Sequence, residues 1–438
     1  MARLDRIARF PPKHIALGLA IRELIAPWTG HPYDFEIWVR LGFYMQNLGF
    51  NPYGSLRYVP GLSSSPYGYT GSISYLPFSA FIFAVTYQIY SLLGEPSRFL
   101  YYFLLKQPMV FADVGTAIVL AKIILQSGDA KSARTAFLVW IYFPLGIIVS
   151  SMWGQLDPIS LFLTLLAIYY FIGSKWLTSA LMLGFSIYLK TLPLVFLPVF
   201  LMQVRASRHV RLSYSFISLA IPIFGTLIPT LAFSWGYRLL YNNVSFQVAI
   251  PSNGAMSALN LVYLAINLPS LAHYVIGATW IPVILAAYVY VWKRGFSLVQ
   301  GLVIAVLVFS ISRPFLPEQW SLYPLAFLLL VQTGENMGHF LGLAMSATAF
   351  TIANNTLLVR FFTPISVNAF NWDIFINNQS PYVDLRIAVM SLLAVFYFTE
   401  AFLVVTGRES IIYRAIASIK LELPLQRLRV SPTEVYPA

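Results

Sequence analysis

Long apolar runs recur along the whole of this 438-residue chain, and only short polar segments separate them. A helix needs about 20 apolar residues to cross the hydrocarbon core of a bilayer, so runs of this kind predict membrane spans. Charged residues make up 10% of the sequence, whereas soluble domains contain about 25%. We therefore expect an all-α, polytopic membrane protein in which residues 1–438 form a single membrane domain.

The charge pattern indicates which partners the chain has. The formal net charge is +12, but the basic residues form short clusters between apolar runs, as they do in the cytosolic loops of membrane proteins. We expect the chain to contact membrane lipid and not to bind nucleic acid. The absence of cysteine excludes disulfides, thiolate metal sites and thiol nucleophiles.

The apolar runs predict about 12 membrane-entering helices, with residues 1–14 and the basic tail 407–438 in the cytosol. Two runs are ambiguous. Ser74–Leu93 either crosses the membrane or lies at its outer surface, and Ser179–Met202 is either one span or a hairpin that turns at Lys190. The remaining predicted spans are Ile15–Trp28, Phe99–Leu125, Thr135–Met152, Pro158–Gly173, Ser213–Trp235, Ser270–Trp292, Phe296–Ile311, Trp320–Thr333, Gly338–Leu358 and Asp384–Thr406.

The distribution of the 28 Lys and Arg residues favours one arrangement. More of them lie on the cytosolic side when Ser74–Leu93 stays outside and Ser179–Met202 is a hairpin. Residues 29–98 then form a long first outer loop with juxtamembrane helices. This arrangement also brings separate polar residues to the outer face, namely Asp34, Glu36, Asp157, Lys190, Arg313 and Glu318.

The segment His31–Arg40, with the sequence HPYDFEIWVR, places two carboxylates at the edge of the membrane. A charge placed there costs about 2.5 to 3.5 kcal/mol, so Asp34 and Glu36 need a reason for their position. The two carboxylates point to one side of an extended segment and diverge in a helix. Asp34 could act as a general base toward a hydroxyl, or it could cap the following helix with Glu36 in the first turn. These two roles are compatible.

A second polar segment, WGQLDP, separates two apolar runs at Trp153–Pro158. Its spacing alone favours a capped turn, in which Asp157 caps the helix and Pro158 occupies the first turn. Lys106 and Asp113 lie seven residues apart in one predicted span, which favours a buried polar partnership over a catalytic pair.

Two cations at the predicted outer interface could bind a lipid phosphate. Lys190 lies at the apex of the predicted hairpin, and Arg313 lies in the segment SRPFLPEQW. The ordinary alternative is that such side chains reach out to the lipid head groups.

Together these motifs resemble the GT-C superfamily of polyprenyl-phosphate-sugar-dependent glycosyltransferases, and above all the dolichyl-phosphate-mannose-dependent mannosyltransferases. The order of the motifs over residues 15–200 carries the resemblance, whereas the second half shares only a span pattern and the late loop SRPFLPEQW. The motifs are HPYDFEIW in the first outer loop, Asn51-Pro52-Tyr53 followed by SSPYGYTGSISYLPF, the WGQLDP turn, and a K-x-x-P-x-x-x-x-P helix with Lys190, Pro193 and Pro198.

The resemblance implies an inverting hexosyltransferase with Asp34 as the catalytic aspartate. Glu36 would take the second acidic position of a D-x-D motif. Gln155 and Asp157 would line the same outer cavity. Lys190 and Arg313 would bind the donor phosphate, and Glu318 completes the expected substrate-binding set.

The resemblance also implies the substrates and the location. A polyprenyl- or dolichyl-phosphate sugar, with mannose expected, would be the donor, and a lipid-linked glycan or another hydroxyl would be the acceptor. A divalent cation is compatible with this reaction but not required, and the five histidines are too dispersed to predict a metal site. The active site would face the non-cytosolic side of a prokaryotic plasma membrane or of the endoplasmic reticulum.

Two other classes of protein stay open. A secondary transporter also has about 12 spans and intramembrane charges such as Lys106 and Asp113. Against it, the two halves of the sequence show no internal repeat, and the acidic residues gather at the predicted outer edge. A non-catalytic subunit of a glycan-assembly complex is the third class.

Overall fold

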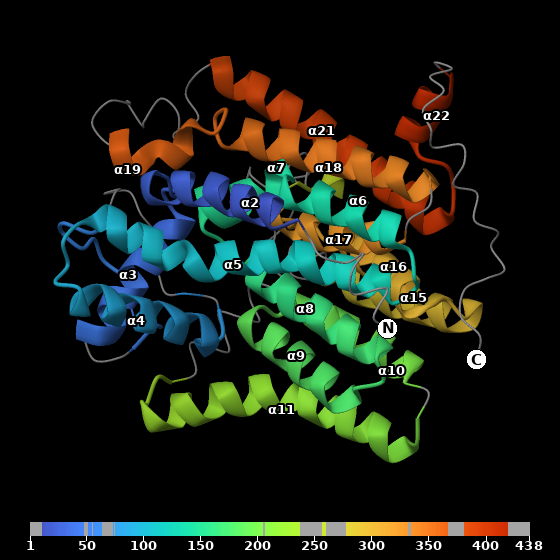
Figure 1. Ribbon diagram of the computed structural model, residues 1–438, viewed down its shortest axis with the longest axis horizontal. Coiled ribbons are helices and arrows are strands. Elements are labelled where there is room, and N and C mark those ends of the chain that lie inside the picture. The colour runs from blue at the N-terminus through green and yellow to red at the C-terminus, as the bar shows by residue number, and fades with distance from the viewer. Residues whose placement is uncertain are drawn as a thin grey trace. The chain divides into compact units, whose positions relative to one another are not determined.

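The computed structural model describes residues 11–47, 51–54, 56–63, 73, 75–204, 206–236, 256–259, 277–331, 334–366 and 381–418. Every regular element in these ranges is a helix (Figure 1), which confirms the all-α class. Residues 1–10 of the predicted N-terminal segment and 419–438 of the predicted tail lie outside the described residues. The chain divides into two compact units, Met1–Ala249 with Thr351–Arg386 and Ile250–Phe350 with Ile387–Ala438. The single domain expected for residues 1–438 stays a prediction.

The first unit is built around α5, against which α2, α6 and α8 pack (Figure 1). Beyond these, α9 packs on α8, and α11 packs on α9. In chain order its helices are α2 (Pro12–Ile25), η1 (Ala26–Trp28), α3 (Asp34–Asn47), α4 (Pro77–Leu92), α5 (Arg98–Leu125), α6 (Ala130–Ile141), α7 (Pro144–Ile147), the π-helix η2 (Ile148–Trp153), α8 (Asp157–Ile172), α9 (Trp176–Leu189), η3 (Leu192–Phe196), α10 (Leu197–Gln203), α11 (Arg208–Ala232), η5 (Val359–Phe362) and α19 (Thr363–Ser366).

The second unit contains most of the C-terminal helices. Within it α15 packs on α16, and α16 packs on α17. Its helices are α15 (Trp280–Arg294), α16 (Leu298–Ser312), η4 (Glu318–Ser321), α17 (Leu322–Leu330), α18 (Gly334–Asn354), α21 (Pro381–Thr406) and α22 (Ile411–Ser418). The last turn of α18 and the first residues of α21 count with the first unit.

The predicted number of about 12 membrane-spanning helices is wrong for the described part of the chain. Three helices there are long and apolar enough to cross a membrane: α5, α11 and residues Asp384–Thr406 of α21. The number rises to five if each of two bent helix pairs is one span. These pairs are Ala130–Ile141 with Pro144–Trp153, bent by 46°, and Asn336–Asn354 with Val359–Ile365, bent by 54°.

The sequence overestimated the spans because an apolar run is not always one long helix. The predicted span Thr135–Met152 breaks where Pro144 begins a new helix, since proline lacks the N–H that would continue the preceding one. The predicted span Pro158–Gly173 corresponds to α8, whose 16 residues measure about 24 Å, less than the roughly 30 Å hydrocarbon core. Only nine residues of the predicted span Trp320–Thr333 form α17.

The structure also bears on the two ambiguous runs. A helix break at Lys190 is confirmed, because α9 ends at Leu189 and Lys190 adopts an extended conformation before η3 begins. In the run Ser74–Leu93, α4 has 16 residues and is not among the helices long enough to span. Instead α4 packs against α3, the helix that carries Asp34.

An aromatic core holds α3 against α4 and α5. Trp38 of α3 stacks on Phe83 of α4 with ring centroids 4.8 Å apart, and both side chains are fully buried. A Cβ atom at Gly42 would come within 2.3 Å of the Tyr101 hydroxyl and 2.8 Å of the Phe83 carbonyl oxygen, so only glycine allows this approach. This packing positions the start of α3.

A buried ion pair ties α2 to α5. Nε and Nη2 of Arg22 donate to Oδ2 of Asp113 at 2.9 and 2.8 Å. The indole N–H of Trp140 donates to Oδ1 at 2.9 Å, and the Ser150 hydroxyl donates to Oδ2 at 3.1 Å. The predicted partnership between Lys106 and Asp113 is therefore wrong, because Arg22 takes the place expected for Lys106.

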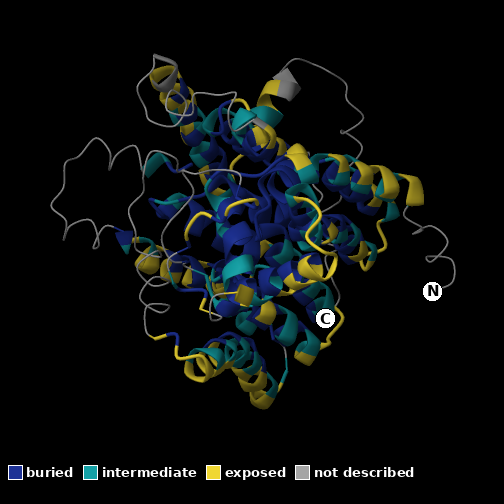
Figure 2. Ribbon diagram, turned by 90° about the vertical axis from the view of Figure 1, so that its left-hand side faces the viewer, coloured by how far each residue is buried: buried dark blue, intermediate teal, exposed yellow. Residues whose placement is uncertain are grey.

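Helix α11 differs from the other candidate spans in how little of it is covered. Its apolar residues Leu212, Phe216, Ile228 and Leu231 are 57, 67, 62 and 70% exposed. Yellow exposed and teal intermediate segments accordingly mark this helix at the bottom of Figure 2. Such a face is what a helix presents to lipid.

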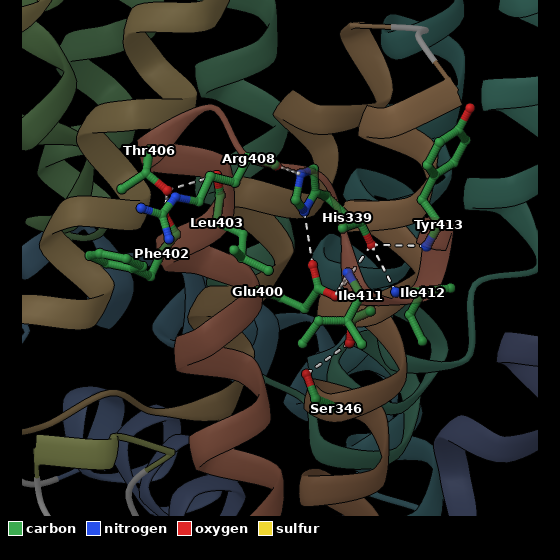
Figure 3. A network of polar contacts seen from close by, with 12 residues as sticks. His339, Ser346, Glu400, Phe402, Leu403, Thr406, Arg408, Ile411, Ile412 and Tyr413 are labelled. Atoms are coloured by element: carbon green, nitrogen blue, oxygen red, sulfur yellow. Dashed lines mark hydrogen bonds and ion pairs between the residues drawn. The ribbon is translucent and has the colours of Figure 1, made fainter. Parts of the chain in front are cut away.

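A polar network in the second unit joins α18, α21 and α22 (Figure 3). Nδ1 of His339 lies 2.8 Å from Oε2 of Glu400, and Nε2 lies 3.1 Å from the carbonyl oxygen of Arg408. Oε1 of Glu400 accepts from the Ser410 hydroxyl and from the N–H of Ile411, the first residue of α22. Glu400 is fully buried and thus links all three helices.

Candidate functional site

Asp34 is the first residue of α3, and its side chain is 35% exposed. The backbone N–H groups of Tyr33 and Asp34 donate to Nδ1 of His31 at 3.3 and 3.2 Å. His31 thereby satisfies two N–H groups that the start of a helix leaves unpaired. The capping role considered for Asp34 falls to His31, and the Asp34 carboxylate is available for other contacts.

Trp153 and Gln155 bind the carboxylate of Asp34. The indole N–H of Trp153 and the amide N–H of Gln155 both donate to Oδ2 of Asp34, at 3.0 and 2.9 Å. Two donors on one oxygen fix the orientation of the carboxylate. The segments HPYDFE and WGQLDP, which lie more than 100 residues apart, therefore meet as the shared-cavity prediction requires.

The backbone around Trp153 is adapted to this contact. The π-helix η2 ends at Trp153, and the N–H groups of Gly154 and Gln155 both donate to the carbonyl of Val149. Gly154 has a φ of +77°, and a Cβ atom there would approach the Phe35 ring to 2.6 Å. Glycine adopts this conformation without strain, so the turn depends on it.

Lys106 joins the residues that precede the segments HPYDFE and WGQLDP, through backbone carbonyls and one hydroxyl. Its ammonium donates to the carbonyl oxygens of Ala26, Thr29 and Met152 at 2.9, 2.6 and 3.4 Å, and to the Thr29 hydroxyl at 3.1 Å. It also lies 4.7 Å from the centre of the Phe35 ring. Because Lys106 is fully buried, these contacts hold the residues before His31 against the residue before Trp153.

Asp157 and Lys190 form a buried ion pair, with 2.6 Å between Nζ and Oδ2. Asp157 begins α8, and Lys190 follows the end of α9. The Lys190 ammonium also lies 5.4 Å from the centre of the Tyr75 ring. Burial raises the pKa of the Tyr75 hydroxyl well above 10, and the charges of Asp34 and Asp157 raise it further. The carboxylates of Asp34 and Asp157 therefore both raise the pKa of the neutral Tyr75 hydroxyl.

We call the residues Asp34, Tyr75, Trp153, Gln155, Asp157 and Lys190 the Asp34 site.

Two buried oxygen atoms of the Asp34 site lack a donor. Oε1 of Gln155 and Oδ1 of Asp157 accept no hydrogen bond from any described residue. Gln155 is 1% exposed and Asp157 is fully buried. Buried acceptors normally have a partner, so the site is suited to a ligand that brings hydrogen-bond donors, such as hydroxyl groups.

Glu36 lies apart from these contacts. Its carboxylate accepts from Nε of Arg40 at 3.3 Å, and both side chains are fully buried. Arg40 also donates to the hydroxyl of Ser63 and the carbonyl of Leu56. Glu36 therefore helps to hold the loop 56–63 against α3, and its role as a second catalytic acid stays a prediction.

Arg313 and Glu318 belong to the second unit. Arg313 is fully buried, and its guanidinium carbon lies 5.4 and 4.7 Å from the ring centres of Phe309 and Trp320. Its carbonyl accepts from the hydroxyl of Ser257 at 2.9 Å. Glu318 begins η4 and is also buried. Their contribution to donor binding stays a prediction.

His31 is neutral at pH 7. Burial lowers its pKa to about 4, and this effect is larger than that of the neighbouring Asp34 charge, which raises the pKa. Because Nδ1 accepts from the backbone, the single proton lies on Nε2. The ring also stacks on Trp153 at 5.0 Å, so His31 supports both Asp34 and one of its donors.

Sequence reasoning missed several residues of this arrangement. His31 precedes Asp34 by three residues, the spacing at which a polar side chain reaches the first N–H groups of a helix, and this spacing could have identified it. Trp153 and Tyr75 lie in stretches that were singled out. Their contacts could not be read from the sequence, because their partners are distant along the chain.

No three His, Cys, Asp or Glu side chains in the described residues come together to hold a metal ion. Neither the models of known protein families nor the curated proteins match this chain. The function must therefore be inferred from the Asp34 site and the motifs.

Proposed function

We propose that this protein is a membrane glycosyltransferase of the GT-C type. It transfers a hexose, with mannose the first candidate, from a polyprenyl- or dolichyl-phosphate sugar to a hydroxyl group of a lipid-linked glycan or similar acceptor. The reaction takes place on the non-cytosolic face of the membrane. Candidate membrane spans in both units agree with a lipid-linked donor.

The observation that carries the proposal is the contact of Trp153 and Gln155 with Asp34. It joins HPYDFEIW and WGQLDP, two of the four motifs whose order supports the resemblance to the GT-C superfamily. It also leaves a carboxylate that is partly exposed and held in one orientation, next to buried groups that lack donors. A catalytic base needs both access to its substrate and a fixed geometry.

In the proposed reaction Asp34 accepts the proton of the acceptor hydroxyl. The hydroxyl oxygen attacks the anomeric carbon of the donor, the bond from that carbon to the phosphate oxygen breaks, and the lipid phosphate leaves with the electron pair. One displacement inverts the anomeric centre. The free oxygens of Gln155 and Asp157 would accept hydrogen bonds from sugar hydroxyls.

Lys190 is the cation of the first unit that is suited to the departing phosphate. Its ammonium has three N–H donors, and in the described residues only Asp157 accepts from it. Charge-assisted hydrogen bonds from such a group stabilise the charge that develops on the phosphate. Arg313 stays the second candidate for this function.

The contacts of the buried charges favour an enzyme over a secondary transporter. Arg22 and Asp113 are paired with each other, and Lys106 binds backbone carbonyls. These charges are thus engaged in structural contacts, whereas a transporter would use such groups to bind its solute or ion.

The test is an assay of sugar transfer from synthetic polyprenyl-phosphate-mannose by the purified protein in detergent. We expect Asp34→Asn to reduce turnover about 100-fold or more, because a general base contributes about 10² to 10⁴ in rate. Asp129→Asn is the matched control. It makes the same substitution at an exposed helix cap of α6 and should leave turnover unchanged.

Equal turnover by wild type and Asp34→Asn would remove Asp34 from the mechanism. A wild-type protein that transfers no sugar but takes up labelled solute into proteoliposomes would be a transporter. Transfer that requires a second protein would indicate a non-catalytic subunit.

A further inference from the structure

A groove of about 430 Å³ lies at the N-terminal ends of α9 and α11. This volume falls within the range of ligand-binding pockets, about 300 to 1,000 Å³. Trp176 and Leu177 from α9 and Val210 and Ile217 from α11 give it mainly apolar walls. Tyr214, which also lines it, is buried, so the groove is part of the packed structure.

Apart from a tyrosine, the titratable groups around this groove are all basic residues. Lys175 and His209 line it, and Arg208 and Arg211 flank it in the first turn of α11. Within the described residues none of these four side chains forms an ion pair. The sequence contains no Asp or Glu between Asp157 and Glu318, so α9 to α11 carry no acidic side chain that could neutralise the groove.

The groove also lies at one end of a candidate membrane span. Helix α11 starts at Arg208, is long enough to cross a bilayer, and exposes the apolar side chains of Leu212 and Phe216 just beyond its basic first turn. A basic site at the end of an apolar, exposed helix stands at the depth of the lipid head groups. The basic groove and the exposed apolar face of α11 thus adjoin each other in the same way as the head group and the acyl chains of a phospholipid.

We propose that this groove binds one anionic phospholipid, with the phosphate between Lys175 and His209 and an acyl chain along the exposed apolar face of α11. The charge of the groove selects an anionic head group, and the adjoining apolar face selects a lipid over a soluble phosphate. The inference does not depend on the transferase activity, because the groove does not include any residue of the Asp34 site.

Native mass spectrometry of the full-length protein released from detergent tests this proposal, with phosphatidylglycerol and phosphatidylcholine of identical acyl chains as probes. We expect the wild-type protein to retain phosphatidylglycerol in preference to phosphatidylcholine. Lys175→Gln should weaken its binding about fivefold, the loss expected for one basic residue near a lipid surface. Ser213→Trp, which fills the groove without changing its charge, should abolish binding.

Lys131→Gln is the matched control, because it removes one exposed lysine from α6 outside the groove and should bind as wild type does. Equal retention of the two lipids by wild type, or unchanged retention in both groove variants, would overturn the proposal. Displacement of phosphatidylglycerol by soluble glycerol phosphate would show that the groove recognises a free phosphate and not a lipid.

Discussion

At the scale of single residues, His31 links the stability of the Asp34 site to its protonation state. Its Nδ1 atom accepts two backbone N–H bonds only while that nitrogen is unprotonated. Burial favours this neutral form and holds the pKa at about 4, against 6.5 for a free histidine. Acid should therefore disturb the start of α3.

We predict that acid destabilises the folded protein through His31. Between pH 6.5 and pH 4 the unfolded chain binds a proton at His31 that the folded chain does not, so the stabilisation is complete above pH 6.5 and falls as the pH approaches 4. The difference between a pKa of about 4 in the folded protein and 6.5 in the unfolded chain corresponds to roughly 3 kcal/mol of folding stability. Thermal unfolding in detergent at a series of pH values measures the loss.

His31→Asn is the informative variant for this prediction. Asparagine supplies an oxygen that can accept from the same N–H groups and does not titrate in this range. The difference in stability between wild type and His31→Asn at each pH should therefore give the contribution of the histidine. Parallel pH profiles for the two proteins would refute the assignment.

At the scale of helices, Glu400 holds three elements together. It pairs with His339 of α18, belongs to α21 and accepts from the first N–H group of α22. Gly342 allows this close approach, since a Cβ atom there would lie 2.9 Å from Cγ of Glu400. The position of α22 therefore depends on one buried carboxylate.

We predict that Glu400→Ala lowers the free energy of unfolding by about 3 to 5 kcal/mol, because it leaves a buried histidine and the start of α22 without their acceptor. Glu400→Gln should cost less, since its amide oxygen can still accept from Ile411. Glu409→Ala, at an exposed glutamate, is the control. Denaturation in detergent compares the three, and equal stability of Glu400→Ala and Glu409→Ala would contradict the prediction.

At the scale of the whole molecule, the topology predicted from the sequence places the two ends of α8 on opposite sides of the membrane. Asp157 of the Asp34 site is at its first turn, and Lys175 follows its last. The 16 residues of α8 are short for a span, so its ends need local thinning of the bilayer or burial among neighbouring helices.

We predict that single cysteines report this arrangement, since the natural chain has none to interfere. Tyr58→Cys, in the loop packed on α3, should react with an impermeant maleimide supplied on the non-cytosolic side, which for a plasma membrane means intact cells. Lys175→Cys should react only after permeabilisation. Both positions are exposed, so access to the side chain is not limiting. Labelling of both from the same side would rule out the proposed topology.

The sequence by itself determined the helical class, and it offered the helix break at Lys190 as one of two alternatives for Ser179–Met202. It also singled out the segments HPYDFE and WGQLDP, which the structure brings into contact. These follow from local properties, namely apolar content, proline and glycine positions, and the cost of charges near hydrocarbon. The length of Phe99–Leu125 was also predicted to within one residue, because an uninterrupted apolar run continues as one helix.

Only the tertiary structure decided the number of candidate spans and the partners of the charged residues. Asp34 binds Trp153 and Gln155, Asp113 binds Arg22 in place of Lys106, and Glu36 turns to Arg40. Apolar periodicity shows which residues avoid water but not which distant segment covers them. Most of these pairs join atoms about 90 or more residues apart, and only the packing of whole helices brings such atoms together.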